Sequence, residues 1–336
     1  MLMSSASSAF EGIYQGQKAI YLRAGAYEAV MLPEIGGNLV AFRDLVNGYR
    51  FLREPAHEDM QKFRENSIVW GIPVLFPPNR YEDGKFPWNG RIYQLPINEP
   101  ATDNHLHGFL YQTPWEVESF GHKGDESFVT VSVKVDEDHP AYRRLPFNYT
   151  VRLHYSLGPD GLSQRVTLRN DGSESMPCLL AFHTTLNAPF SPGSKAQDCK
   201  LKLTIGERWE MSPRMLPTGS FMPLSAEEEN MKEDGVDPFW TALDHHYTAV
   251  PQNGRNRMEL TDTKRGVTLV YDVGTSYKQW MLYNNQGRGE FFCPEPQVNL
   301  VNAPNMSLPA EEMGLFGLEP GEIWEERARF YVKVGR

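Results

Sequence analysis

The sequence predicts an all-β protein built as a large antiparallel β-sandwich. First, apolar residues recur at every second position in many segments, which is typical of strands with one buried face. Second, 28 glycines and 25 prolines separate these segments. Third, we find no helical pattern of ten or more residues between the strands, as an alternating α/β fold would require.

The predicted strands run from the middle of the chain to its end. Residues 129–135 and 151–157 alternate apolar and polar side chains most clearly. A further strand ends in the turn Asn170-Asp171-Gly172. Two short helices are also predicted, at residues 58–64 and at the acidic residues 226–232. The strand before that turn is 162–168, and the remaining predicted strands are 201–205, 267–271 and 330–334.

Size and composition favour one large domain, residues 1–336. The chain has 336 residues, with 40% hydrophobic and 12% aromatic, enough to bury a sizeable core. Neither a Gly/Ser linker, nor a low-complexity block, nor a fixed-period repeat marks a boundary.

Charge and cysteine content exclude several classes of function. A net charge of -10 and no cluster of Lys and Arg argue against nucleic acid as a partner. The three cysteines lie in no CxxC spacing, which favours a reducing cytoplasm. The first ten residues lack the pattern of a signal peptide, and no run approaches the roughly 20 apolar residues that cross a bilayer. We therefore expect a cytoplasmic protein without a membrane partner.

One segment gathers more chemistry than a purely structural sheet protein needs. Asn79-Arg80 precedes a predicted turn and strand, and His105-Leu106-His107-Gly108 follows. On a strand, His105 and His107 would lie on one face, as in a metal site. No third or fourth ligand is near them in the sequence, and Gly108 indicates a turn. A loop histidine bonded to backbone is the competing interpretation.

Two other residues have side chains suited to proton transfer. His183 ends an apolar run that predicts a buried strand, so it is either a packing residue or a general acid. Glu295 lies between Pro294 and Pro296, just after two aromatic residues. The prolines fix the backbone and apolar neighbours raise a carboxylate pKa, which suits a general base. A turn glutamate that faces solvent is an equal alternative.

For candidate sugar-binding side chains, the local pattern allows two interpretations each. Asp244 could accept hydrogen bonds from sugar hydroxyls or cap a turn. Four tryptophans could stack on a sugar ring, although core packing is their default role. They are Trp70, Trp88, Trp115 and Trp280.

Taken in order, these motifs resemble the aldose 1-epimerase, or galactose mutarotase-like, superfamily over most of the chain. The ordered set is more specific than any one motif in it. The resemblance implies a large antiparallel β-sandwich with a sugar-binding cleft, in agreement with the strand pattern. The motifs are Asn79-Arg80, Gly84-Lys85-Phe86, Gly90-x-x-Tyr93-x-Leu95, Asn104-x-Leu106-His107-Gly108, His183 with Asn187, Asp244-His245 and Glu295-x-Gln297.

The resemblance further implies an isomerase that interconverts the α and β anomers of a monosaccharide. Glu295 would be the general base for the anomeric hydroxyl, and His183 the general acid for the ring oxygen. No cofactor and no metal would be needed, because the reaction involves neither redox change nor hydrolysis. The protein would act as a monomer or a homodimer.

The same resemblance implies a substrate-binding set around this pair. His107 and Arg80 would bind near the ring oxygen, and Asp244 would hold distal hydroxyls. Asn79 and Gln297 belong to the same motifs and complete the set.

Three alternatives stay open at this point. The run 71–77 also resembles the hexose-6-phosphate epimerase branch, whose members hold a phosphate with basic residues; Arg43 and Arg50 are candidates. A carbohydrate-binding protein without turnover would keep the cleft alone. A metal-dependent sandwich enzyme would centre on His105 and His107.

Overall fold

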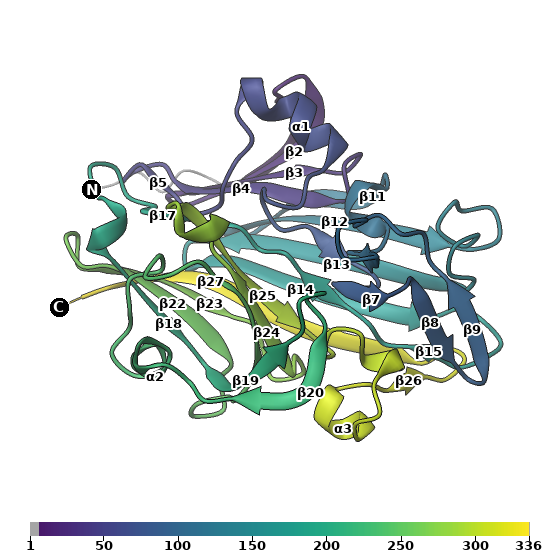
Figure 1. Cartoon of the computed structure of the whole chain (residues 1–336). Coiled ribbons are helices and arrows are strands. Elements are labelled where there is room, and N and C mark those ends of the chain that lie inside the picture. Colours follow the sequence, from purple (N-terminus) through teal and green to yellow (C-terminus); the bar gives the residue numbers. More distant parts are fainter. Residues whose placement is uncertain (1–6, 336) are drawn as a thin grey trace.

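Three antiparallel sheets dominate the structure, a computed structural model that describes residues 7–335 (Figure 1). Residues 1–6, part of the segment examined above for a signal peptide, lie outside the described residues. Among helices within 7–335, none is long and apolar enough to cross a membrane. The predicted all-β sandwich is confirmed.

The first large sheet, called the β13 sheet, has eight strands and contains most of the predicted ones. In spatial order the strands are β11 (Glu116–Lys123), β12 (Glu126–Val135), β13 (Tyr149–Gly158), β14 (Gly161–Asn170), β27 (Ile323–Val334), β23 (Val267–Asp272), β22 (Arg257–Asp262) and β18 (Cys199–Leu203).

The second large sheet, called the β25 sheet, also has eight strands. One of them, β17, pairs with β25 beside the main path. The strands are β20 (Pro217–Met222), β19 (Ile205–Met211), β21 (Asp244–Ala249), β24 (Gln279–Tyr283), β25 (Glu290–Gln297), β16 (Ala181–Phe182), β6 (Val74–Leu75) and β17 (Leu186–Ala188).

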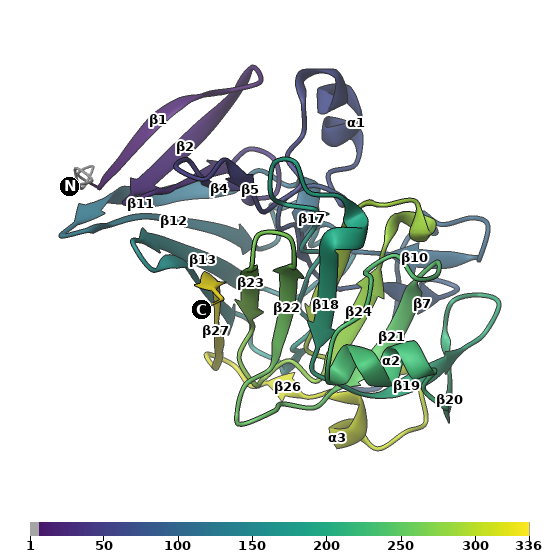
Figure 2. The ribbon, with the colours of Figure 1, turned by 90° about the vertical axis from the view of Figure 1, so that its left-hand side faces the viewer.

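An N-terminal sheet of five strands packs beside β12 and β13 (Figure 2). Its apolar residues Leu22 and Phe42 join the same core as Val129 of β12. The strands are β1 (Ser8–Tyr14), β2 (Gln17–Ala24), β3 (Tyr27–Leu32), β4 (Asn38–Asp44) and β5 (Tyr49–Arg50).

Two-stranded pairs and short helices fill the connections. The two-stranded pairs are β7 (Arg80–Glu82) with β10 (Asn104–Leu106), β8 (Lys85–Trp88) with β9 (Arg91–Gln94), and β15 (Met176–Pro177) with β26 (Gly317–Leu318). The α-helices are α1 (Met60–Glu65), α2 (Ala226–Lys232) and α3 (Ala310–Met313).

The core lies between the two large sheets, where each strand turns its apolar face inward. On β13, Val151, Leu153 and Tyr155 are buried while the residues between them reach solvent. The sheets meet through Tyr271 of β23, whose ring lies 6.5 Å from that of Trp280 on β24. Burial of such large apolar side chains is the main stabilising contribution.

Most predicted elements match the structure, with one error in a strand. Helix α2 has the predicted bounds, and α1 is preceded by a 3-10 turn at His57–Asp59. The predicted strand 201–205 is wrong at its end, because the chain leaves β18 after Leu203 and enters β19 at Ile205. Between them the Thr204 hydroxyl bonds Asn256, which fixes the crossing from one sheet to the other.

The loop after β10 packs closely around Gly108. Its φ is +66°, and a Cβ there would lie 2.1 Å from the Phe76 carbonyl oxygen. Gly90 has a φ of +75° but open space around it. We expect Gly90→Ala to lower the free energy of unfolding by about 1–2 kcal/mol, the usual penalty of left-handed backbone. Gly108→Ala should lower it by at least ~2 kcal/mol more.

Urea unfolding of both variants checks this expectation. Because Gly90→Ala carries the same backbone strain, the difference between the variants isolates the steric clash with Phe76. Equal losses in the two variants would contradict the close packing of this loop.

Candidate functional site

The site is built on the face of β25 that turns away from the core. Phe292 points into the core, so Cys293, Glu295 and Gln297 lie on the opposite face by strand alternation. On the neighbouring strand β24, Met281 lies directly opposite Glu295. Glu295 is 1% exposed, so its carboxyl group is withdrawn from bulk solvent.

His183 reaches Glu295 because of the register between the strands. Ala181 pairs with Gln297, and Asn187 pairs with Phe291, which places His183 opposite Glu295. Opposite residues share one face of a sheet at close distance. Accordingly, His183 Nε2 lies 3.2 Å from Glu295 Oε1, within reach of a shared proton.

The turns next to strands β7 and β10 form a second wall of the site, beside His183 and Glu295. Asn79 and His107 both have left-handed backbone, with φ of +59° and +65°. The His107 amide donates to the Asn79 carbonyl at 2.9 Å, which ties the two turns together. The His107 ring stands edge-on to the His183 ring, with 5.3 Å between centroids.

Arg80 is held in place by Glu99. Its Nε and Nη2 donate to the two Glu99 oxygens, at 2.9 Å each. This bidentate geometry fixes the guanidinium plane. The same Nη2 lies 3.8 Å from Asp244 Oδ2 at the start of β21. Arg80 therefore joins the β7 wall to the β25 sheet.

Burial sets the protonation of this cluster. It raises the pKa of Glu295 well above its usual range, and the nearby charge of Asp244 raises it further. Burial also lowers the pKa of His183 to about 3, and the charge of Arg80 lowers it as well. The pKa of His107 is lowered well below its usual value for the same reason, burial first. The resting cluster therefore favours neutral imidazoles and a carboxyl group that holds its proton tightly.

Several buried polar atoms around the pair have no hydrogen-bond partner within the described residues. Buried polar groups are normally paired, so such a group of atoms is typical of a site that receives a polar ligand. They include Asn79 Oδ1, His107 Nδ1, His183 Nδ1, Glu295 Oε2 and both polar atoms of the Gln297 side chain.

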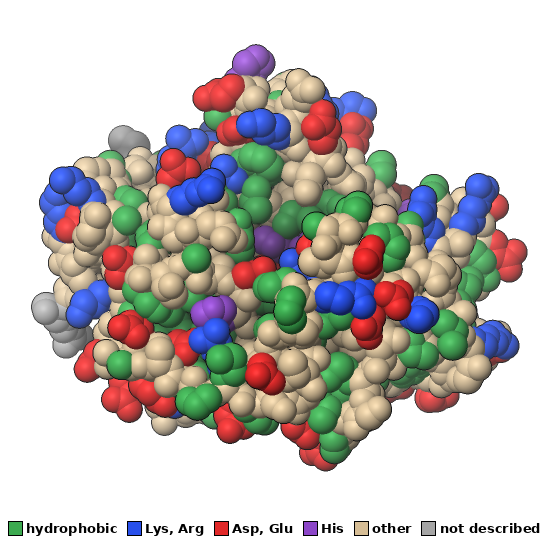
Figure 3. Space-filling model, viewed as in Figure 1, with side chains coloured by type: hydrophobic (Ala, Val, Ile, Leu, Met, Phe, Trp, Pro, Cys, Tyr) green, Lys and Arg blue, Asp and Glu red, His purple; other side chains and the backbone are tan. Residues whose placement is uncertain are grey.

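The surface is hollowed near β25. Figure 3 shows a depression near the middle of this face, with histidine and basic side chains deep inside it. A hollow of about 270 Å³ also lies beside Asp244, lined by Arg208, Met215 and His245 among others.

The structure brings together all seven residues that the sequence singled out for catalysis and binding. They are Asn79, Arg80, His107, His183, Asp244, Glu295 and Gln297.

His105 does not join the cluster, and the interpretation of a shared face with His107 was wrong. The positive φ of His107 breaks the strand alternation after Leu106. His105 Nδ1 instead faces the Pro96 carbonyl at 2.8 Å. Within residues 7–335, no three His, Cys, Asp or Glu side chains gather in a way that could hold a metal ion.

The tryptophans pack into the protein rather than onto the site surface. Of the four tryptophans considered above, all except Trp88 are buried. Three of their indole nitrogens donate within the protein, from Trp88 to Ser175, from Trp115 to Leu110 and from Trp280 to Asn256.

Sequence reasoning missed Arg53. Its guanidinium lies 4.6 Å from the Trp70 ring and 4.1 Å from the Phe291 ring, and Nη1 donates to the Val69 carbonyl. Phe291 shares a face of β25 with Glu295. No pattern in the sequence marks Arg53, because its aromatic partners lie far along the chain.

The two arginines proposed from the sequence as phosphate ligands have other partners. Arg43 binds Glu28 and Glu54, and Arg50 binds Glu54. Within residues 7–335, Arg53 has no carboxylate within ion-pair distance. The candidate phosphate ligand is therefore Arg53 and not Arg43 or Arg50.

Comparison with known proteins shows the family of the chain. Residues 18–331 match the aldose 1-epimerase family. The chain belongs to this family. A similar family member is a galactose mutarotase-like protein from Clostridium acetobutylicum, with 31% identity and a TM-score of 0.93 over 97% of this chain and 98% of that chain.

More distant relatives share parts of the sequence or the fold alone. The uncharacterized Escherichia coli protein YphB is 24% identical over 75% of this chain and 79% of its own length. The uncharacterized Escherichia coli protein YihR is 30% identical over 34% of this chain and 35% of its own length. A galactose 1-epimerase from Lactobacillus acidophilus covers 99% of this chain and 100% of its own, with 17% identity and a TM-score of 0.73, a likeness of fold.

Replacing Glu295 should stabilise the protein near neutral pH. Because its pKa is raised on folding, the stability linked to this group is complete below the ordinary value of 4.5 and is lost as the pH rises through the raised pKa. Glutamine is neutral at every pH. We therefore expect Glu295→Gln to have a higher free energy of unfolding than the native protein at neutral pH.

Denaturant unfolding at several pH values measures this difference. The gain should shrink as the pH falls toward 4.5. Glu290→Gln, an exposed change on the same strand, is the matched control and should show no such trend. A gain for Glu295→Gln that stays constant with pH would contradict the assigned direction.

Proposed function

We propose that this protein is an aldose 1-epimerase that interconverts the α and β anomers of a monosaccharide by acid and base catalysis. The observation that carries the proposal is the 3.2 Å contact between His183 Nε2 and Glu295 Oε1 on one buried face. Ring opening acts on two oxygens bonded to the same carbon. An acid and a base in contact are suited to reach both oxygens together.

Ring opening moves one proton from the sugar to the protein and one from the protein to the sugar. Glu295 takes the proton from the anomeric hydroxyl, the electron pair of that O–H bond forms the carbonyl, and the bond from C1 to the ring oxygen breaks. His183 gives its proton to the leaving ring oxygen. The open aldehyde turns about its C1–C2 bond, and the same steps in reverse close the ring on the other face.

The protonation of the pair fits this cycle. The ion pair of Glu295 carboxylate and His183 imidazolium has the same number of protons as the neutral pair. Burial favours the neutral pair, which is the state that ring opening produces. Burial therefore favours the protonation state that follows ring opening. The reaction involves neither redox change nor hydrolysis, so it needs no cofactor.

The surrounding residues would bind the sugar. His107 and Arg80 stand next to the pair and can donate to the ring oxygen, and Arg80 is pre-organised by Glu99. Asp244 lies beyond Arg80 and can accept from hydroxyls at the far end of the ring. Asn79 and Gln297 carry buried amide atoms that find no hydrogen-bond partner among residues 7–335, and sugar hydroxyls can satisfy them.

Glu295→Gln tests the catalytic role. The amide cannot take the proton of the anomeric hydroxyl, so we expect anomer interconversion to fall by about 10²–10⁴-fold. Sugar affinity should change little, because glutamine keeps the shape and can still hydrogen-bond. Saturation-transfer NMR on a panel of free aldoses, with buffer catalysis subtracted, measures the rate, and ligand-observed NMR measures binding.

Glu290→Gln serves again as the matched control and should keep full activity. Full activity in Glu295→Gln would overturn the assignment of the base. Sugar binding by the native protein without any interconversion across the panel would favour a binding protein that lacks turnover.

Arg53 supports a second candidate, a hexose-6-phosphate 1-epimerase. Its guanidinium is clamped between Trp70 and Phe291, and within residues 7–335 it has no ion pair. Arg53 lies near Cys293 in the cluster. Burial raises the pKa of the Cys293 thiol, and the positive charge of Arg53 partly opposes this rise. A phosphate or another anionic substituent on the sugar would give this arginine the charged partner that it lacks.

Arg53→Gln separates the two candidates. If the substrate is a phosphosugar, the variant should lower kcat/KM for glucose 6-phosphate by about 10–100-fold, the effect of losing one charged hydrogen bond. Activity on free glucose should not change. Arg50→Gln, a nearby arginine that pairs with Glu54, is the control. Native activity on free aldoses alone, unaffected by Arg53→Gln, would exclude the phosphosugar candidate.

A further inference from the structure

A row of basic side chains crosses the outer face of the β13 sheet. His154 on β13 lies directly opposite Arg165 on β14, and Arg165 lies directly opposite Arg327 on β27. Like charges placed opposite each other on adjacent strands repel and destabilise the sheet. The register therefore places together two guanidinium groups that an acidic partner would stabilise.

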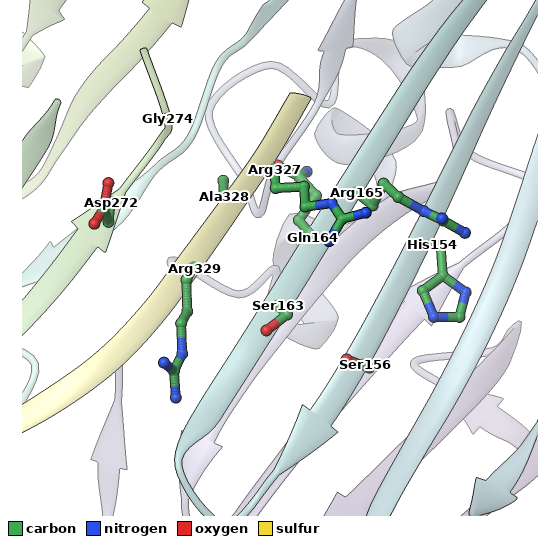
Figure 4. A pocket seen from close by; sticks show the side chains of 10 residues that line it. All are labelled: His154, Ser156, Ser163, Gln164, Arg165, Asp272, Gly274, Arg327, Ala328 and Arg329. Atoms are coloured by element: carbon green, nitrogen blue, oxygen red, sulfur yellow. The ribbon is translucent and has the colours of Figure 1, made fainter. Parts of the chain in front are cut away.

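The adjacent row adds hydroxyl donors to this arrangement. Ser156, Ser163 and Arg329 lie side by side on the same three strands, one step along from the first row. Both rows line a hollow of about 580 Å³. In Figure 4 the Arg165 and Arg327 side chains lie close together, with His154 and Arg329 on either side. The hollow thus gathers guanidinium, hydroxyl and imidazole groups within one concave surface.

The positive charge of the hollow is only partly balanced. Within residues 7–335, Arg165 has neither an ion pair nor a side-chain hydrogen bond. Arg329 contacts the Tyr331 ring and the Asp160 carbonyl rather than a carboxylate. Arg327 is paired with Glu325.

Among residues 7–335, Asp272 is the acidic residue that lines the hollow, and its carboxylate forms an ion pair with Arg255 at 3.0 Å. A net excess of positive charge is notable in a chain of net charge -10.

We propose that this hollow is a binding site for a small phosphate-bearing molecule. Tetrahedral phosphate oxygens accept hydrogen bonds from guanidinium and hydroxyl groups, and a dianion offsets the repulsion between Arg165 and Arg327. A compact ligand is favoured over an extended polyanion. Acidic residues bound the basic rows on both sides, with Glu325 and Glu118 near one edge and Asp272 near the other. They would repel a nucleic acid that extended past the hollow.

The site is separate from the proposed sugar site. On β14, Leu162 and Val166 face the core while Ser163 and Arg165 face outward. On β25, Phe292 faces the same core while Glu295 faces away from it. The two sites therefore lie on opposite sides of the sandwich. Binding at the hollow does not require that the protein be an epimerase.

Titration with inorganic phosphate tests the proposal. We would follow backbone amide shifts by NMR in the native protein, at constant ionic strength with chloride as the exchanged anion. Saturable shifts should map to β13, β14 and β27. Arg165→Gln should weaken this binding by about tenfold, since a charged donor is lost. Arg165→Lys, which keeps the charge, should retain part of the affinity.

Two matched variants make the test specific. Arg152 lies exposed on the same face and already pairs with Glu118. Arg152→Gln should therefore leave phosphate binding unchanged. Arg53→Gln removes the arginine next to the proposed sugar site, and should also leave the shifts on β13 and β14 unchanged. Equal weakening by Arg152→Gln would mean diffuse charge attraction and would overturn the proposal. Absence of saturable shifts on these strands, or shifts abolished by Arg53→Gln alone, would overturn it as well.

Discussion

The register between β25 and the segment 181–188 is the constraint on which the candidate site depends. The side-chain period of a strand is two, so a slip by one residue would turn Glu295 into the core and Phe292 out of it. Pairing on both sides of β25 prevents such a slip, with Ala181 opposite Gln297 on one side and Met281 opposite Glu295 on the other.

The prolines beside Glu295 explain why this pairing is interrupted next to the site. The Val298 amide donates to Leu180, so the even-numbered residues of β25 face the segment 181–188. Pro294 and Pro296 are even-numbered and have no N–H to donate. The ladder therefore splits into β16 and β17, and residues 183–185 lie between them. Their amides turn instead toward the opposite neighbour, with His183 donating to Pro73 and Thr185 to Gly71.

The buried polar groups of the site lower the stability of the folded state. A carboxyl group and two imidazoles are buried together, and several of their polar atoms lack partners within the described residues. Such groups destabilise the folded state unless they gain hydrogen bonds. The large core between the two sheets supplies the stability that permits this arrangement, and Arg80, held by Glu99, fixes the wall that faces the pair. The two outward faces of the same sandwich differ in kind. One presents the buried pair of His183 and Glu295, and the other an exposed basic hollow.

The sequence by itself determined the fold class, the family and most strands, and it predicted which residues form the candidate site. Strand alternation is local, and the ordered motifs from Asn79 to Gln297 identified the family without knowledge of distances. Tertiary structure alone decided the rest. The contact of His183 with Glu295 depends on a register set by residues far apart in the chain, and the turn at His107 separates it from His105. Arg53, clamped by Trp70 and Phe291, has no local signature, and the basic row from His154 to Arg327 depends on pairing between distant strands. Local patterns specify which face a side chain occupies, whereas only long-range pairing decides which side chains meet on it.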